Sequence, residues 1–159
     1  MRKINNRDVP EEVWSSPQGK FNGGGKAISE ALGRKALSTD LLERHPFDVE
    51  LTRIPAGATP YPYHSHAAQW EFYHVLAGTG AVRHEGGSTP IEPGDSFLFP
   101  PNEAHQLIND GKEDLLIFVI ADNPFGESCY YPDSKKWLVR APERKLMRGA
   151  ALDYYDGEE

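Results

Sequence analysis

Two segments of the chain carry side chains that can bind a metal ion. In the first segment, His64 and His66 are separated by one residue, and Glu71 follows shortly after them. Successive side chains on a β-strand point to opposite faces, so the two imidazoles should point to the same face. Residues 67–70 are long enough for a tight turn, which would return Glu71 on the neighbouring strand beside the histidines. These three side chains could then hold one metal ion between them.

The second segment, residues 94–109, supplies His105 within a frame of glycine, proline and asparagine. Three imidazoles and one carboxylate suit a divalent transition metal such as Mn, Fe, Co, Ni or Zn. Four protein ligands leave positions open for water or substrate, as catalysis by a metal requires. Gln69 is an alternative to Glu71 if the turn is one residue tighter, although an amide oxygen is the poorer ligand. The other histidines lack such a pattern and are interpreted as ordinary surface or core residues: His45, His74 and His84.

Strand alternation also predicts which side chains accompany the ligands into a pocket. If Glu71 faces the ion, Tyr73 and Val75 face inward with it, and Leu107 accompanies His105. These side chains are candidate substrate contacts in a pocket that would be apolar with a few polar groups. Tyr73 is also a candidate proton donor, but a core tyrosine whose hydroxyl finds a partner would show the same pattern.

The middle of the chain is patterned as short strands separated by turn residues. Apolar and polar residues alternate over residues 47–54, and residues 80–91 contain two short strands joined by a turn. Residues 115–121 form the most apolar run, which is too short to span a membrane and predicts a buried core strand. Such spacing is typical of a β-barrel or β-sandwich.

The two ends of the chain differ in composition from the middle. Residues 1–34 are rich in Gly, Pro, Asn and charge, and predict an irregular arm with one short helix near residues 26–32. The triple glycine at residues 23–25 lacks the spacing of a phosphate-binding loop, so we interpret it as a flexible linker. Residues 35–38 are strand-like, and the aromatic residues 129–140 could fold back over the barrel.

The overall composition excludes several classes of protein. The chain has 159 residues, a net charge of −7 and a pI near 5.4, which argues against a nucleic-acid or anionic-membrane surface. Cys129 is the only cysteine, so no intramolecular disulfide can form, and we interpret this residue as structural. No apolar run approaches the roughly 20 residues of a membrane-spanning helix. The default expectation is a soluble cytoplasmic protein that acts on a small molecule.

The two metal-ligand segments resemble the motifs of the cupin superfamily, which read G-x5-H-x-H-x3–4-E-x6-G and G-x5-P-x-G-x2-H-x3-N. The residues that match the ligands of the family are His64, His66, Glu71 and His105, and those that match its framing positions are Gly57, Gly78, Gly94, Pro100 and Asn109. There are two departures, because six residues separate Gly57 from His64, and Asn102 replaces a glycine. Asparagine tolerates a left-handed backbone better than most residues, so Asn102 should preserve the turn.

The resemblance implies an all-β fold, the double-stranded β-helix or jelly-roll barrel of the cupins, with the metal in its mouth. We expect the barrel to occupy residues 35–140, with an N-terminal arm at 1–34 and a C-terminal tail at 141–159. Small cupins commonly dimerise through barrel faces or exchanged terminal strands. A homodimer is therefore expected. The long arm and the strand-like residues 35–38 support it weakly, because an exposed edge strand could pair with the sheet of a partner.

The chain further resembles small single-domain bacterial cupins that are labelled sugar-phosphate-isomerase-like. This resemblance implies a sugar or sugar-phosphate isomerase that uses the metal as a Lewis acid. A phosphate would need cations, and between Gly57 and Asn109 the only Arg or Lys is Arg83. The candidates elsewhere are Arg53, Lys135, Lys136 and Arg140. Two alternatives stay open, an iron-dependent oxygenase and a non-catalytic small-molecule-binding module, and the metal's identity would separate the two enzymes.

Overall fold

The computed structural model describes residues 1–36, 38, 40–140 and 143–158. The short helices are a 3-10 helix (Asn6–Asp8), α1 (Ile28–Ala31) and α2 (Leu41–Arg44). The strands are β1 (Glu12–Ser15), β2 (Asn22–Ala27), β3 (Phe47–Ile54), β4 (Ser65–His66), β5 (Glu71–Ala77), β6 (Gly80–His84), β7 (Gly87–Ile91), β8 (Ser96–Phe99), β9 (His105–Ile108), β10 (Leu115–Asp122), β11 (Ser128–Tyr131), β12 (Lys136–Val139) and β13 (Lys145–Met147). Among these described residues, no helix is long and apolar enough to cross a membrane.

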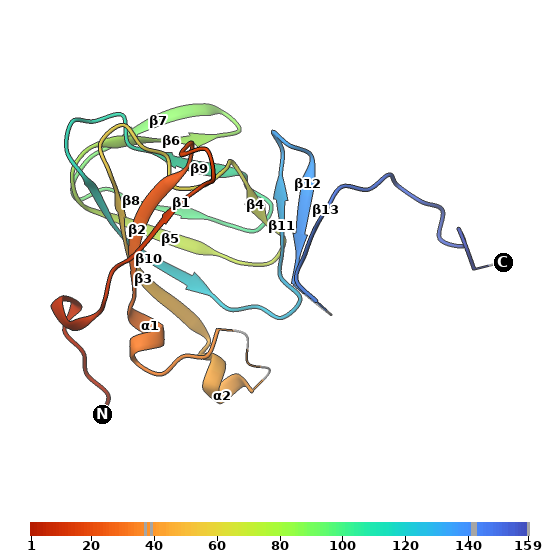
Figure 1. Cartoon of the computed structure of the whole chain (residues 1–159), viewed down its shortest axis with the longest axis horizontal. Coiled ribbons are helices and arrows are strands. Elements are labelled where there is room, and N and C mark those ends of the chain that lie inside the picture. Colours follow the sequence, from red (N-terminus) through yellow and green to blue (C-terminus); the bar gives the residue numbers. More distant parts are fainter. Residues whose placement is uncertain (37, 39, 141–142, 159) are drawn as a thin grey trace.

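The described residues form three sheets, and two of these build the barrel (Figure 1). The larger has the strand order β1-β2-β3-β10-β5-β8, and the smaller has the order β7-β6-β9. One buried cluster joins Val75 and Ile117 of the larger sheet to Val82 and Leu107 of the smaller, so the two sheets pack face to face. This arrangement confirms the predicted all-β, double-stranded β-helix architecture.

Strand β10 is the centre of the larger sheet, as the apolar run at residues 115–121 predicts. It pairs antiparallel with β3 on one side and with β5 on the other. Leu115 and Ile117 are fully buried. A strand with a neighbour on each side and a core beneath it must be apolar on the inward face, which explains the composition of this run.

The N-terminal segment is more ordered than the sequence suggested, and the prediction of a flexible linker at the triple glycine is wrong. Gly23, Gly24 and Gly25 are buried in β2, which pairs with both β1 and β3. The indole of Trp14 lies against this strand, and a Cβ built on Gly23 would come within 2.8 Å of the ring. The glycines therefore allow a large aromatic ring to approach the backbone, which periodicity alone does not reveal.

The connection between β2 and β3 contains the two short α-helices. Helix α1 lies within the segment where a helix was expected. The strand expected at residues 35–38 is not present at Lys35, Ala36 or Ser38, and residue 37 lies outside the described residues. Helix α2 begins after Asp40, whose carboxylate accepts a hydrogen bond from the backbone N–H of Leu42 and caps the helix.

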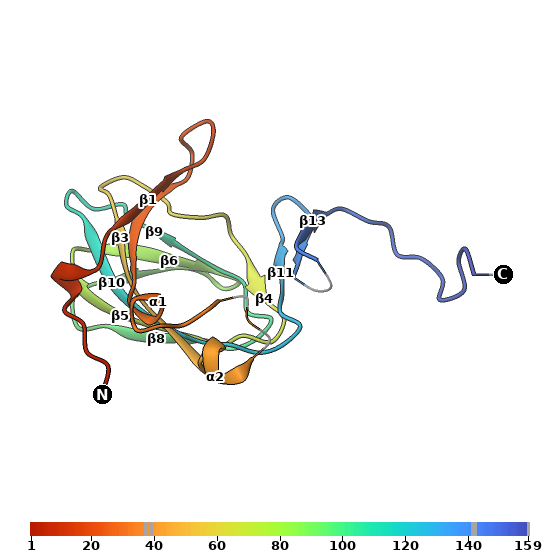
Figure 2. The same ribbon diagram turned by 60° about the horizontal axis from the view of Figure 1, so that its bottom comes forward.

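A third sheet lies at one end of the barrel and has the order β13-β12-β11-β4 (Figure 1). Its contact with the barrel is through β4, where Cys129 pairs with His66 and Tyr130 pairs with Ser65. The aromatic residues 129–140 thus pack beside the strand that carries a predicted metal ligand. After β13 the chain runs away from the body of the molecule, as both views show (Figures 1 and 2).

Candidate metal centre

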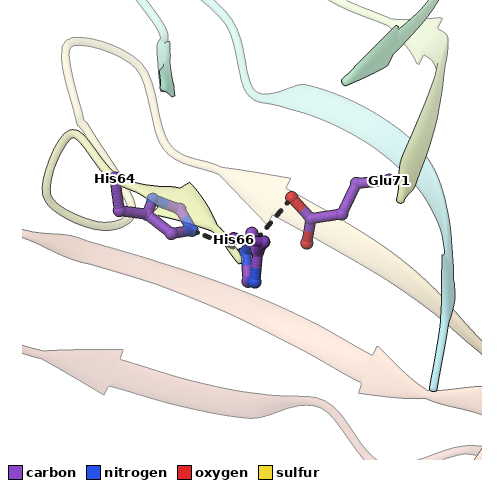
Figure 3. Close-up of side chains that lie close together, drawn as sticks. All are labelled: His64, His66 and Glu71. Atoms are coloured by element: carbon purple, nitrogen blue, oxygen red, sulfur yellow. Dashed lines mark hydrogen bonds and ion pairs between the residues drawn. The ribbon is translucent and has the colours of Figure 1, made fainter. Parts of the chain in front are cut away.

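Three predicted ligands converge at the end of the barrel. His66 lies in β4 and Glu71 is the first residue of β5, while His64 immediately precedes β4. The Nε2 atom of His66 is 3.1 Å from Nε2 of His64 and 3.4 Å from Oε2 of Glu71 (Figure 3). Ligand atoms of all three side chains lie within 4.8 Å of one another, which is close enough for one ion to contact each of them.

His105 enters the same cluster from the opposite sheet. Its backbone pairs with that of His64 through reciprocal N–H to carbonyl hydrogen bonds of 2.8 and 3.1 Å. Its Nε2 atom lies 2.9 Å from Oε2 of Glu71, and its ring stacks on Phe99 with centroids 4.1 Å apart. The structure therefore brings the fourth predicted ligand to the other three, although the two segments lie far apart in sequence.

The turn residues around the ligands adopt the conformations that the motifs require. Asn102 has a φ of 71°, in the left-handed region, as expected from its place in the motif. Asn109 is fully buried, and its amide donates to the carbonyls of Ile54 and Glu113. The second asparagine thus ties the end of β9 to two other segments and is structural.

The hydrogen bonds of the histidine rings are consistent with metal binding. The Nδ1 atom of His64 lies 3.0 Å from the carbonyl of Pro62, and that of His105 lies 3.2 Å from the carbonyl of Glu103. A carbonyl only accepts hydrogen bonds, so Nδ1 of each ring carries the proton. With an ion bound, Nε2 of each ring would carry no proton and its lone pair would face the ion, which is the form of imidazole that binds a divalent transition metal.

Burial and charge set the pKa values of two ligands in directions that favour the metal-binding form. Burial, together with the neighbouring His105 and His66, lowers the pKa of His64 to about 4, so this ring is neutral at pH 7. Burial would raise the pKa of Glu71, but the hydrogen bond with His105 and the charge of His66 outweigh it and lower the pKa to about 2.

His66 behaves differently from His64 because its second ring nitrogen faces acidic groups. Burial would lower its pKa, but contacts with Cys129 and Glu127 and the charge of Glu71 outweigh this effect and raise it to about 10. Without a metal ion, His66 is therefore protonated at neutral pH. Glu127 was not foreseen from the sequence, because a single acidic residue in a loop has no distinctive spacing.

A cavity of about 280 Å³ opens beside the ligands. Tyr73 lines it, and its hydroxyl donates to Oε2 of Glu71 over 2.9 Å and lies 3.2 Å from Nε2 of His105. Burial and the charge of Glu71 raise the pKa of this hydroxyl well above its usual range, so it keeps its proton. Val75 and Leu107 belong to the buried core and do not line the cavity.

Gln69, the alternative to Glu71, also borders the cavity. Its amide nitrogen donates to the backbone carbonyl of Asp122 over 2.5 Å, which fixes the orientation of the side chain. Glu71 is the residue whose side-chain oxygen contacts Nε2 of both His66 and His105. The geometry therefore favours Glu71 as the ligand.

The cavity is more polar than the sequence suggested, because β3 forms its far wall. In the register of the sheet, Ala121 of β10 pairs with Glu71 on one side and with Asp48 on the other. Val119 likewise lies between Tyr73 and Glu50. The small side chains of β10 leave room between the two walls, about two strand spacings or roughly 10 Å apart.

The wall of the cavity formed by β3 consists of Asp48, Glu50 and Thr52. The Thr52 hydroxyl donates to the Glu50 carboxylate, but burial and the nearby carboxylates raise the pKa of Glu50. Burial also raises the pKa of Asp48, against the effect of Arg34. Carboxyl groups with raised pKa values in a cavity are typical of acid–base catalysis.

Two arginines line the cavity, and one of them was not predicted. The side chain of Arg34 is 7% exposed and pairs with Glu30 and with Asp48, the latter over 3.1 Å. Arg140, one of the cations considered for phosphate binding, also borders the cavity. Arg53 instead pairs with Glu11 and Asp114 outside it. Lys136 borders a different cavity and Lys135 is not part of this wall.

The family assignment follows from the sequence of the barrel itself. A family model described as a cupin domain matches residues 50–121, which include all four candidate ligands. This segment of the chain is therefore a cupin domain, as the motifs and the fold indicate. No curated protein matches the chain.

Solved structures resemble the whole chain rather than the barrel alone. A protein from Acidithiobacillus ferrooxidans, provisionally named a sugar phosphate isomerase, is 27% identical over 92% of both chains, with a TM-score of 0.77. A sugar phosphate isomerase of the cupin superfamily from Silicibacter pomeroyi is 23% identical over 96% of this chain and 97% of its own, with a TM-score of 0.78. A predicted oxalate decarboxylase from Thermotoga maritima is 19% identical over 77% and 99%, with a TM-score of 0.60. The last two show the shared fold.

Proposed function

We propose that this protein is a metal-dependent isomerase of a small sugar or sugar phosphate. The proposal is carried by one observation. A polar cavity has three of the candidate metal ligands, His64, His66 and Glu71, on one wall, with His105 in contact with Glu71, and a half-buried carboxyl group, Glu50, on the other wall. The provisional name of the relative from Acidithiobacillus ferrooxidans supports the same class of reaction.

His64, His66, Glu71 and His105 would hold the ion, because their neutral imidazoles and one carboxylate form a donor set suited to Mn, Fe, Co, Ni or Zn. When bound, such an ion supplies a Lewis acid that polarises a substrate carbonyl. The Tyr73 hydroxyl, which keeps its proton, lies where it can donate a hydrogen bond to a substrate oxygen beside the ligands.

Glu50 is the proposed group for proton transfer. Isomerisation moves one hydrogen between adjacent carbons and one between their oxygens, so the substrate neither gains nor loses atoms. Glu50 as a carboxylate would take the proton from one carbon, and as an acid would return it to the next. Its raised pKa suits both steps, because such a group exists in both forms nearer to neutral pH.

The phosphate of a sugar phosphate would depend mainly on Arg140. Arg34 is already paired with two carboxylates, so it offers less charge to a ligand. A substrate without phosphate would place only hydroxyl groups against the β3 wall, where carboxylates and a threonine hydroxyl can accept hydrogen bonds. The assay should therefore include both forms of each sugar.

The test is hydrogen exchange in heavy water. The protein is stripped of metal and reloaded with Mn, Fe, Co, Ni or Zn in turn. It is then incubated with aldoses and ketoses of three to six carbons, free and phosphorylated. We expect one metal form to incorporate deuterium next to the carbonyl and to form the isomer, as followed by NMR. The His105→Ala variant should lose both the metal and the exchange.

Glu50→Gln separates proton transfer from metal binding. We expect it to lower turnover by about 100-fold or more, within the range of general acid–base catalysis, with unchanged metal content. Glu85→Gln, a change in an exposed turn, is the matched control and should be fully active. Absence of exchange with every sugar, together with oxygen uptake by the iron form on addition of a substrate, would contradict the isomerase and favour the oxygenase.

A further inference from the structure

His66 is the one candidate ligand whose ring is held on both sides by ionisable groups. Its Nε2 atom faces His64 and Glu71 in the ligand cluster. Its Nδ1 atom lies 3.2 Å from Oε1 of Glu127 and 3.6 Å from the sulfur of Cys129. The ring thus lies between the metal cluster and a second, fully buried group of side chains.

Glu127 is itself held rigidly. It is 3% exposed, and its two carboxylate oxygens accept hydrogen bonds from the backbone N–H groups of Ala67 and Ala68, over 3.1 and 3.0 Å. These N–H groups belong to the turn that directly follows His66. The carboxylate therefore fixes both the ring of His66 and the backbone that leads to Glu71.

The three histidines share one pattern of hydrogen bonding, with one difference. In each ring Nδ1 faces an acceptor outside the cluster and Nε2 faces the cluster. For His64 and His105 the acceptor is a backbone carbonyl, whereas for His66 it is a carboxylate. A carboxylate makes a stronger, charge-assisted hydrogen bond, and it increases the electron-donating power of the imidazole toward a metal.

We propose that Glu127 is a positioning residue of the metal site, which holds His66 with its proton on Nδ1 and its Nε2 lone pair toward the ion. The inference rests on the metal site of the proposed function but not on the reaction. Glu127 lies just before β11, outside the cupin domain at residues 50–121. The segment that leads into the third sheet therefore supplies the residue that orients His66.

Further contacts of β11 agree with this role. The ring of Tyr131 stacks on that of His64 with centroids 5.9 Å apart, and Cys129 is 2% exposed beside His66. Residues of β11 therefore contact two of the candidate ligands, His64 and His66, on the side away from the cavity. Glu127 and Cys129 could alternatively ligate a second ion with Nδ1 of His66, but the Glu127 oxygens are already engaged by two N–H groups, so we assign them the positioning role.

The test measures metal affinity with cobalt(II) as the probe. Glu127→Gln replaces two acceptor oxygens by one, so three donors compete for a single carbonyl. We expect the affinity for cobalt, measured by competition with a chelator, to fall about 10- to 100-fold. The visible absorption spectrum of the bound cobalt should also change, which loss of fold stability alone would not cause. Glu103→Gln is the matched control, because the exposed Glu103 contacts His105 only through its backbone carbonyl.

A second measurement needs no variant. In the zinc-loaded protein, long-range proton–nitrogen NMR correlations should show the His66 proton on Nδ1. A proton on Nε2, an unchanged cobalt affinity in a folded Glu127→Gln protein, or binding of two ions per chain would each overturn the proposal. If the unaltered protein binds no cobalt, the metal site of the proposed function fails instead.

Discussion

His64 and His66 are of the same type and separated by one residue, yet their environments give them different acid–base properties. His64 packs between aromatic rings and a carbonyl, so burial dominates and the ring is neutral. His66 contacts carboxylates through both ring nitrogens and holds a proton. A metal ion at the cluster must therefore displace one proton, and this proton comes from His66.

This difference predicts how metal affinity depends on pH. Glu71 is ionised above a pKa of about 2 and His64 is neutral above a pKa of about 4, so neither releases a proton on metal binding near pH 7, whereas His66 does. Because the pKa of His66 is raised to about 10, the affinity should rise about tenfold per pH unit between pH 6 and 9. Chelator competition at several pH values measures this slope. An affinity that stays constant over this range would contradict the assignment of the proton to His66.

At the level of strands and turns, the positions of the ligands depend on glycines that permit close contacts. Gly78 directly follows β5 and has a φ of 77°, and a Cβ at this position would clash with the backbone carbonyl of Asp114. The turn lets β5 continue into β6 and so connects the sheet that carries Glu71 with the sheet that carries His105. A side chain at Gly78 would disturb this connection.

We therefore expect Gly78→Ala to destabilise the protein by about 1 to 3 kcal/mol, the usual effect of a strained left-handed residue, with the clash adding to it. Urea unfolding followed by circular dichroism measures the change. The matched control is Gly149→Ala, since a Cβ on Gly149 meets nothing within 4 Å. Equal stability of the Gly78 and Gly149 variants would refute the argument.

At the level of the whole molecule, the outer face of the larger sheet is apolar. This outer face consists of side chains that point away from the core: Phe72, Leu76, Leu98, Phe118 and Ile120. Leu76 and Leu98 are 48% and 50% exposed, and Phe72 pairs with both Leu98 and Ile120 across the strands. The polar residues His74 and Ser96 also lie on this face. A largely apolar face of this kind commonly forms a protein–protein interface.

We propose that a second copy of the chain covers this outer face, in keeping with the homodimer expected from the sequence. Light scattering after size exclusion at micromolar concentration should give the mass of a dimer. Leu98→Glu should shift the protein to a monomer, because a charge would be buried in the contact. Leu146→Glu changes an exposed leucine in the third sheet and should leave the dimer intact. A monomeric unaltered protein would rule out this interface.

Several features were predictable from the sequence because they depend on local periodicity and turn chemistry. The alternation of strands placed His64 and His66 together, and the turn residues around Asn102 indicated where His105 would point. The apolar run at residues 115–121 identified the central strand. These are short-range properties, so a barrel or sandwich of short strands and its candidate ligands could be predicted from the residues, whereas the choice of the barrel came from the resemblance to the cupin motifs.

The tertiary structure alone decided the surroundings of the ligands. Glu50 faces the candidate metal ligands across the cavity only because β10 lies between β3 and β5. Glu127 reaches His66 only because β11 pairs with β4. Trp14 packs on the triple glycine because β1 pairs with β2. Such contacts join residues that are distant in the chain, and strand order and register determine them. The sequence therefore specified which side chains can bind the metal, whereas the long-range strand pairing specified the acids that orient a ligand and face the cavity.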